Sequence, residues 1–339
     1  MHNSSNMPET RYRGRRATSI ENETVRVTVL HEGGHIAEIL DKASGVNPLW
    51  TPPWDSIEPS IYDPRKHPEY GADAESKLLS GIMGHNLCMD IFGGPSAEEA
   101  AAGLTVHGEA SVAVYETTAN GTELTQEARF PQSQLRLERR IALAGQTVEV
   151  VEAVENESAT DRPIAWTEHV TLGPPFLEKG ATEFRAPIAK SEVLVEGVGD
   201  PELFTNAPVS GGFTTHLMDP AGGTAFFVAW SPRSQVAVGY IWRRSDFPWL
   251  GIWEENYSRT GAPWNGRTLT RGMEFGASPM PETRRQMIKR GSLFGVPAFR
   301  WIAARTRVEV RYSAAIQGGL KTCPARLIRG EDGEVRFEN

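Results

Sequence analysis

The chain has 339 residues, of which 39% are hydrophobic, and its formal net charge is −8. This length and apolar content suffice for a large packed core. A modest acidic charge, with no dense run of Lys and Arg among aromatic residues, argues against a nucleic-acid partner.

The first twenty residues are polar and rich in arginine, and they lack the apolar segment of a secretory signal. We predict that residues 1–20 form a flexible leader and that residues 21–330 form a single domain. No apolar run is long enough to span a membrane. The only two cysteines, Cys88 and Cys323, do not make a disulfide framework, so we expect a cytoplasmic protein.

Most of the periodic signal along the chain has a period of two. Val25, Val27 and Val29 alternate with polar residues, and similar alternation occurs within residues 135–143, 236–242 and 308–312. Such alternation is typical of half-buried antiparallel strands. We therefore predict an all-β fold with two large sheets packed face to face and the chemistry on connecting loops.

Few segments depart from this strand pattern. Residues 47–80, rich in Pro, Trp and Asp, are predicted to form a long irregular excursion. Ser96 and Glu99 have capping-box spacing, which predicts a helix of one or two turns after Ser96. A second short helix is predicted over residues 281–289.

Two histidines are candidates for proton transfer. His107 precedes Gly108, and glycine allows a sharp turn that brings a side chain to the mouth of a sheet. His169 precedes a Gly-Pro-Pro sequence at residues 173–175, where a strand must end and where concave sites are usually built. Imidazoles give and take protons near neutral pH, which is what an acid–base enzyme requires.

A carboxylate within an apolar stretch is the third candidate. Glu274 lies between Met273 and Phe275, and burying an ionised acid there is costly unless its pKa is raised. An outward-facing strand glutamate explains the same pattern equally well. Glu254 and Glu255 are rivals for the same role, and local spacing does not choose among the three.

Motifs for other chemistry are missing from the sequence. The His and Glu residues near positions 107–109 and 168–169 lack the paired spacing of a zinc site, so we expect no metal. The chain has no nucleophile elbow, Walker loop or dinucleotide-binding glycine motif. We expect no other cofactor.

The aromatic and basic residues suit a carbohydrate. Flat indole rings cover the C–H face of a sugar, and Trp166, Trp253 and Trp264 lie nearest the histidine and glutamate motifs. Arginines over residues 243–271, Arg271 among them, would suit a phosphate or uronate. Solvated strand edges explain the same arginines at least as well.

Taken in order over residues 20–325, these segments resemble the galactose mutarotase-like (aldose 1-epimerase) superfamily. Residues 81–86 resemble the segment that carries a sugar-contacting polar residue, and residues 103–108 resemble the turn with the first active-site histidine. Residues 154–169 resemble the passage into the second histidine, and residues 272–275 resemble the strand with the catalytic glutamate. The chain departs from the family in having His85 or Asn86 where an arginine is expected. It also has no clear counterpart of the aspartate that holds sugar hydroxyls.

The resemblance implies a β-supersandwich with a sugar cleft and an isomerase that interconverts sugar anomers without a cofactor. Glu274 would be the base at the anomeric hydroxyl, His169 the acid at the ring oxygen, and His107 would steady the same oxygen or a neighbouring hydroxyl. The predicted substrate-binding residues are His85, Asn86, Trp166, Trp253, Glu254 and Arg271.

Two alternatives stay open at this point. One is a non-catalytic carbohydrate-binding or regulatory protein on the same fold, and the other is a carbohydrate-processing enzyme that uses two carboxylates. The sequence also leaves open whether the protein is a monomer or a homodimer.

Overall fold

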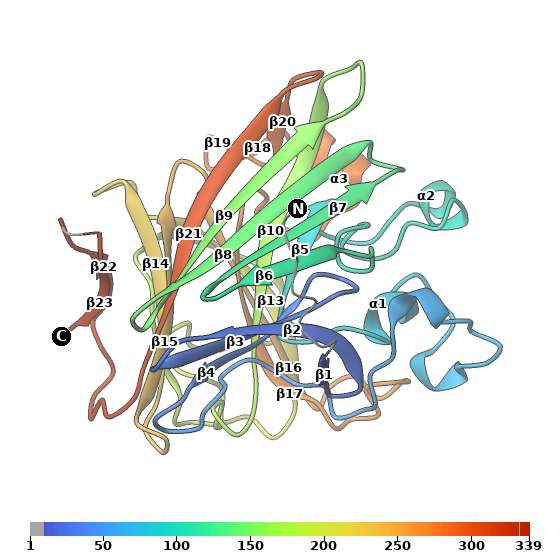
Figure 1. Ribbon diagram of the computed structural model, residues 1–339. Helices are drawn as coiled ribbons and strands as arrows, with labels where there is room; N and C mark the ends of the chain where they lie inside the picture. The colour runs from blue at the N-terminus through green and yellow to red at the C-terminus, as the bar shows by residue number, and fades with distance from the viewer. Residues whose placement is uncertain (1–9, 332) are drawn as a thin grey trace, which may run out of the picture.

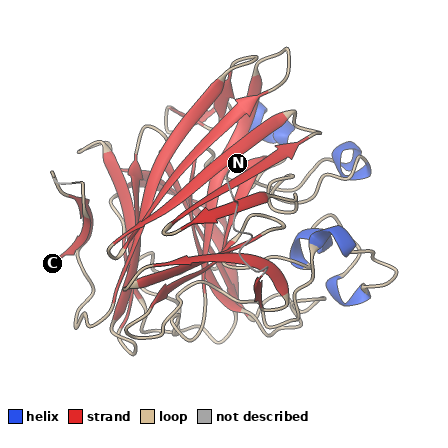
Figure 2. Cartoon of the chain, in the orientation of Figure 1, coloured by secondary structure: helices blue, strands red, loops and turns tan. Residues whose placement is uncertain are grey.

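Two large antiparallel sheets build the molecule, with the few short helices at one side of them (Figures 1 and 2). The computed structural model describes residues 10–331 and 333–339. Within this part of the chain, no helix is long and apolar enough to cross a membrane. The predicted all-β fold is confirmed.

The larger sheet has eleven strands, ten on its main path and one, β20, that pairs with β10. In spatial order they are β1 (Thr10–Tyr12), β2 (Arg15–Glu21), β3 (Val25–Leu30), β4 (Ile36–Asp41), β5 (His85–Asp90), β10 (Arg162–Leu172), β17 (Leu269–Gly276), β16 (Trp249–Asn256), β13 (Ser210–Met218) and β12 (Ile188–Val195), with β20 at Arg300–Ile302.

The smaller sheet has eight strands. In spatial order they are β11 (Glu183–Arg185), β14 (Thr224–Ser231), β15 (Val236–Arg243), β21 (Arg307–Gln317), β9 (Thr147–Asn156), β8 (Leu135–Ala144), β7 (Glu123–Phe130) and β6 (Glu116–Asn120). Two hairpins stand apart from both sheets, β18 (Ser292–Leu293) with β19 (Val296–Pro297), and β22 (Arg326–Arg329) with β23 (Val335–Glu338).

The alternating segments of the sequence fall in strands β3, β8, β15 and β21, as predicted. The prediction of a half-buried strand is wrong for β15, which is buried on both faces because the β22–β23 hairpin packs on its outer side. In β8 the odd-numbered residues, from Leu135 to Leu143, are buried, while the residues between them are at least partly exposed. The buried sides of both sheets contribute to one apolar core. Burial of the apolar side chains of this core is the main force that holds the two sheets together.

A fully buried polar network lies within this core. Arg139 Nε donates to Glu152 at 2.6 Å, and Trp166 Nε1 donates to both Glu152, at 3.1 Å, and Glu168, at 3.2 Å. Glu168 also accepts from the hydroxyl of Tyr312 at 3.1 Å and lies 2.8 Å from Nε2 of His85. Because buried charges are costly without partners, these contacts are what make two acids tolerable in the core.

The helices are short and close to their predicted positions. Helix α2 (Ala97–Ala101) begins after Ser96 with the expected capping box, and α3 (Arg284–Arg290) begins after a second capping box at Thr283, three residues later than predicted. The excursion over residues 47–80 is mostly irregular, as predicted. It contains only two 3₁₀ turns, η1 (Pro59–Ile61) and η2 (Pro68–Tyr70), and helix α1 (Ser76–Leu79).

The predicted flexible leader is wrong for residues 10–20, which form β1 and most of β2; residues 1–9 lie outside the described part of the chain. The reason is Arg15, which is buried and donates to Glu58 at 2.9 Å and to the carbonyl oxygen of Glu32 at 2.9 Å. The ordered fold also extends past residue 330. Leu327 and Val335 of the β22–β23 hairpin pack on the outer side of the smaller sheet.

Candidate active site

Four adjacent strands of the larger sheet, β5, β10, β17 and β16, carry the centre of the candidate site. In their register Asn86, His169, Glu274 and Gly251 stand side by side in one row. Residues paired in this way point to the same face of the sheet. Nε2 of His169 therefore lies 3.0 Å from Oε1 of Glu274.

Glycines around Glu274 make room for its carboxyl group. A Cβ atom on Gly272 would lie 2.4 Å from Oε1 of Glu274. Gly251 stands beside Glu274 on β16, and the ring of Phe213 occupies the space that a Cβ there would need, at 2.6 Å. Gly272 thus leaves room for the carboxyl group, and Gly251 leaves room for the ring of Phe213 beside it.

His107 reaches the same place from the loop between α2 and β6. Its backbone is left-handed, with φ of 66°, and a Cβ on the following Gly108 would lie 1.9 Å from the carbonyl oxygen of Met89. The turn therefore requires glycine after the histidine. Nδ1 of His107 is 2.6 Å from the carbonyl oxygen of Phe92, so Nδ1 carries the hydrogen and Nε2 of the neutral ring is an acceptor. The rings of His107 and His169 have centroids 5.0 Å apart.

These three side chains share one cavity of about 170 Å³ with mostly apolar walls. The ring of Trp253 meets that of His169 edge to face, with centroids 5.8 Å apart. Trp264 lines the cavity next to Trp253, and their ring centroids are 6.1 Å apart. The remaining walls are formed by Glu75, Leu79, Ile82, Phe92, Gly93, Gly94, Val106, Phe213, Arg259 and Pro281.

Burial moves the pKa of His107, His169 and Glu274 toward the value that favours the neutral form of each. It raises the pKa of Glu274 to about 8 and lowers that of His107 to about 4. Burial, and then the neighbouring His107, hold the pKa of His169 well below its usual value. At neutral pH the pair of His169 and Glu274 therefore holds one proton, which lies mainly on the carboxyl group.

The carboxyl group of Glu274 lacks the partners that a buried acid normally has. Its Oε1 is within ion-pair distance of His169 but has no hydrogen-bond partner among the described residues. Nδ1 of His169 is 2.9 Å from Oγ1 of Thr171, which fixes the orientation of the ring. An acid held this way can exchange a proton with a ligand in the cavity.

Of the residues predicted from sequence, His107, His169, Trp253 and Glu274 line the cavity. Asn86 lies on the same face beside His169, but it does not line the cavity, and its Nδ2 donates to Oγ of Ser111 at 3.2 Å.

Four predicted substrate-binding residues point to the opposite face of the sheet, and their assignment to the cavity is wrong. His85 and Trp166 belong to the polar network of the core. Arg271 and Glu254 form a fully buried ion pair of 3.5 Å, in which the guanidinium group of Arg271 also stacks on the ring of Phe184 at 4.2 Å. The physical reason is the period of a strand, because residues one or three positions apart face opposite sides.

Among the three rival acids, only Glu274 lines the cavity. Glu255 instead holds the following loop, since its carboxylate accepts from the backbone N–H groups of Ser258, at 2.7 Å, and Arg259, at 2.9 Å. Two further lining residues are Glu75, which the sequence did not single out, and Arg259, which it indicated only as one of several arginines over residues 243–271. Both lie in loops, where no periodic pattern indicates which side chains face inward.

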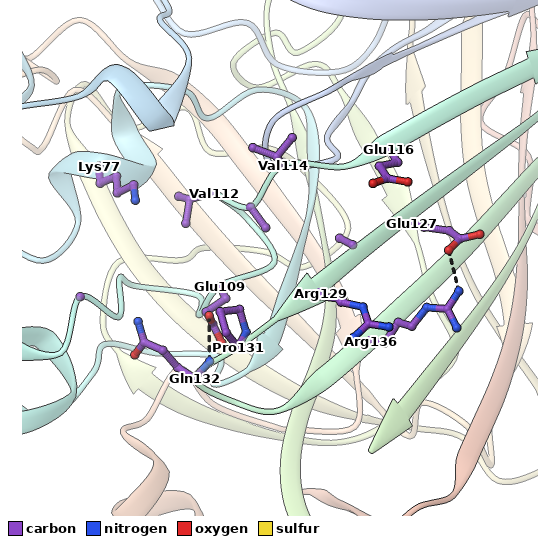
Figure 3. Close-up of a pocket in the computed structure, with 13 residues that line it drawn as sticks. Lys77, Glu109, Val112, Val114, Glu116, Glu127, Arg129, Pro131, Gln132 and Arg136 are labelled. Carbon is purple, nitrogen blue, oxygen red and sulfur yellow. Dashed lines mark hydrogen bonds and ion pairs between the residues drawn. The ribbon is translucent and has the colours of Figure 1, made fainter. Parts of the chain in front are cut away.

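A larger pocket lies elsewhere, between α1 and the strands β7 and β8, with a volume of about 500 Å³ (Figure 3). Several of its charged side chains are engaged with the protein itself. Glu127 pairs with Arg136 at 2.6 Å, and Glu109 accepts from the backbone of Gln132 at 3.2 Å. None of the predicted site residues lines this pocket, so its size alone does not make it the active site.

A metal ion would bind where several suitable side chains gather. In the chain from residue 10 onward, position 332 aside, no three His, Cys, Asp or Glu side chains gather as metal ligands would. Both cysteines are free thiols.

Comparison with solved structures assigns the architecture to the galactose mutarotase-like fold. A Klebsiella pneumoniae protein described as a "putative aldose 1-epimerase" superposes with a TM-score of 0.70 at 14% identity, over 90% of this chain and 80% of that chain. A galactose mutarotase related enzyme from Lactobacillus acidophilus has a TM-score of 0.59 at 13% identity, over 91% and 99% of the two chains. A galactose mutarotase-like protein from Clostridium acetobutylicum gives 0.59 at 14% identity, over 91% and 97%.

At such identities the likeness concerns the fold, because one fold hosts many functions. Residues 13–262 match the family described as a domain of unknown function, DUF4432, and the chain belongs to that family. Among curated proteins, none is significantly similar to the chain in sequence.

Proposed function

We propose that the protein interconverts the anomers of a sugar by acid–base catalysis, with Glu274 and His169 as the proton-transfer groups. The observation that carries this proposal is a buried carboxyl group at a cavity with apolar walls, whose Oε1 lies 3.0 Å from an imidazole and has no hydrogen-bond partner in the part of the chain that the structure describes. The fold of the structural neighbours, some of which bear mutarotase names, supports the same reading.

The reaction needs two proton transfers and no change of oxidation state. A base takes the proton of the hydroxyl on the anomeric carbon, the bond from that carbon to the ring oxygen breaks, and an acid protonates the ring oxygen. Rotation of the resulting aldehyde and closure by the reverse steps give the other anomer. One base and one acid are sufficient, each contributing roughly 10²–10⁴-fold.

The pair of Glu274 and His169 has the protons that this cycle requires. Moving its single proton from the carboxyl to the imidazole gives a carboxylate beside an imidazolium. In that state Glu274 is the base and His169 the acid. Above about pH 8 the pair loses this proton, because burial raises the pKa of Glu274 to about 8. The exchange rate should therefore fall as the pH rises through that value.

Neighbouring groups support binding of a sugar ring. The neutral His107 offers Nε2 as an acceptor for a hydroxyl group, since its Nδ1 hydrogen is held by Phe92. Trp253 and Trp264 provide apolar rings at the cavity wall. The two-carboxylate alternative is less well supported, because Glu254 faces the other side of the sheet and Glu75, the second acid of the cavity, is paired with Arg259.

Saturation-exchange NMR on a panel of free and phosphorylated aldoses tests the proposal. We expect the wild-type protein to speed anomer exchange of at least one sugar. Glu274→Gln and His169→Asn should each lower the rate by roughly 10²–10⁴-fold. Glu123→Gln, at an exposed ion pair on β7, is the matched control and should keep the wild-type rate.

Two results would count against the proposal. Binding of a sugar without faster exchange would favour the non-catalytic binding protein. A Glu274→Gln variant with wild-type exchange would remove Glu274 from the reaction.

A further inference from the structure

An ion pair stands at the rim of the cavity and joins two loops that are far apart in the sequence. Nη1 of Arg259 donates to both carboxylate oxygens of Glu75, at 2.9 and 3.2 Å. Both side chains line the cavity and are partly exposed, at 39% for Arg259 and 28% for Glu75. Arg259 is the only Lys or Arg among the lining residues.

Two aromatic rings hold the guanidinium group of Arg259, and a hydrogen bond holds the backbone of the same residue. Its central carbon lies 4.7 Å from the ring centre of Trp264 and 5.7 Å from that of Trp253. The buried Glu255 fixes the loop through the backbone N–H of Arg259 and also lies 3.9 Å from Nε. Such stacking and anchoring fix the direction of the donors.

The rim carries one positive and two negative charges. The single positive charge of Arg259 lies between Glu75 and Glu255. Nη2 makes no hydrogen bond to any residue in the described ranges, so it can donate to a ligand while Glu75 accepts from the same ligand. A donor and an acceptor side by side match two adjacent hydroxyl groups of a neutral sugar. An arginine that binds a phosphate or carboxylate instead offers its bidentate edge without a competing acid.

We propose that Glu75 and Arg259 act together as the specificity-determining pair of the cavity, binding adjacent hydroxyl groups and rejecting sugars that carry a carboxylate or phosphate. The inference rests on the proposed function, because it concerns the substrate of the same site. Glu75 is the element that rejects anions, since Glu255 already offsets the charge of Arg259 and Glu75 adds a second negative charge at the cavity wall.

Equilibrium binding by ligand-observed NMR tests the pair. The probes are D-glucose, D-galactose and D-mannose, each compared with its own uronate and 6-phosphate. We expect the wild-type protein to bind at least one neutral sugar more tightly than both of its anionic derivatives. Glu75→Gln should lower the ratio of the anionic to the neutral Kd by roughly threefold or more, which is the scale of a partly exposed charge pair.

Glu123→Gln removes the same charge from an exposed pair outside the cavity, so it should leave the ratio unchanged. Tighter binding of a uronate or phosphate by the wild-type protein, binding of no neutral sugar, or an unchanged ratio in Glu75→Gln would each overturn the inference.

Exchange rates measured on the same samples separate this inference from the proposed function. A neutral sugar that binds selectively without faster exchange would contradict the isomerase activity and leave the selectivity in place. Faster exchange of anionic sugars alone would contradict the selectivity and leave the isomerase activity in place.

Discussion

Each face of strand β10 buries a contact between an acid and an imidazole, and the two acids differ in their hydrogen-bond partners. On the core face, Glu168 lies 2.8 Å from His85 and accepts hydrogen bonds from Trp166 and Tyr312. On the cavity face, one residue later, His169 lies 3.0 Å from Glu274, whose Oε1 has no hydrogen-bond partner in the described ranges.

Burial raises the pKa of the acid on both faces, for Glu168 and for Glu274. A raised pKa therefore does not separate a structural acid from a catalytic one. What separates them is the set of partners, because a satisfied carboxyl group is held in the fold while an unsatisfied one at a cavity can react.

Removing the cation of the core network should have the largest effect on stability. Arg139→Met leaves Glu152 and Glu168 buried without the guanidinium group that donates to Glu152 at 2.6 Å. We expect the free energy of unfolding, measured by chemical denaturation, to fall by roughly 3–5 kcal/mol. Arg140→Met, at the exposed pair with Glu123, should cost less than about 1 kcal/mol. Equal losses in the two variants would mean that the core network is not stabilised by Arg139.

On the cavity face, burying Glu274 becomes less favourable for folding as the pH rises. Substitution of this acid should therefore remove a pH-dependent loss of stability. The folded protein raises the pKa of Glu274 from 4.5 to about 8, so it binds this proton more tightly than the unfolded chain does. The contribution of Glu274 to stability is then fully present below about pH 4.5 and is lost as the pH rises through 8.

Glu274→Gln cannot titrate at this position and should not show this loss. The difference in unfolding free energy, wild type minus variant, should decrease by up to about 1.4 kcal/mol per pH unit between pH 5 and 8. A difference that does not change with pH would contradict the raised pKa.

Moving the carboxyl group without changing its chemistry should have an intermediate effect on activity. A Cβ atom at residue 272 would lie 2.4 Å from Oε1 of Glu274, so Gly272→Ala must displace that oxygen. We expect anomer exchange to slow by roughly 10–100-fold, as for other small misplacements of a reacting group. In the control Gly199→Ala, the new Cβ has no atom within 4 Å, and the rate should not change. An unaffected rate in Gly272→Ala would show that the position of Oε1 is unimportant.

The smallest effect is expected for the residue that orients the imidazole. Thr171→Val removes the hydroxyl group 2.9 Å from Nδ1 of His169 while keeping the shape of the side chain. We expect kcat for anomer exchange to fall by roughly 3–10-fold, the scale of one hydrogen bond. The valine variant should bind sugar as tightly as the wild type. A loss of binding with unchanged kcat would assign Thr171 to the substrate rather than to His169.

Much of the fold could be predicted from the sequence because many strands have one exposed face. Alternation in β8 gave its position directly, since every second residue is buried. The first strands were missed because Arg15 in β2 is a buried arginine, and its partners Glu58 and Glu32 are not visible in the local sequence.

The candidate site was harder to predict because β10 and β17 are almost entirely buried on both faces. Composition therefore does not tell the cavity face from the core face. The two-residue period of a strand does tell the faces apart, because residues three positions apart point to opposite faces. Trp166 is three residues before His169, and Arg271 is three before Glu274. Arg259, in a loop far along the chain from Glu75, carries no such signal.

The protonation state of Glu274 is the most direct test of the central claim, that a buried carboxyl group whose Oε1 has no hydrogen-bond partner among the described residues holds the proton used in catalysis. Infrared difference spectra between the wild-type protein and Glu274→Gln isolate this group from Glu152, whose pKa burial raises to about 7. We predict a protonated carboxyl band at pH 6 that disappears with a midpoint near pH 8. A carboxyl group already ionised at pH 6 would contradict the account.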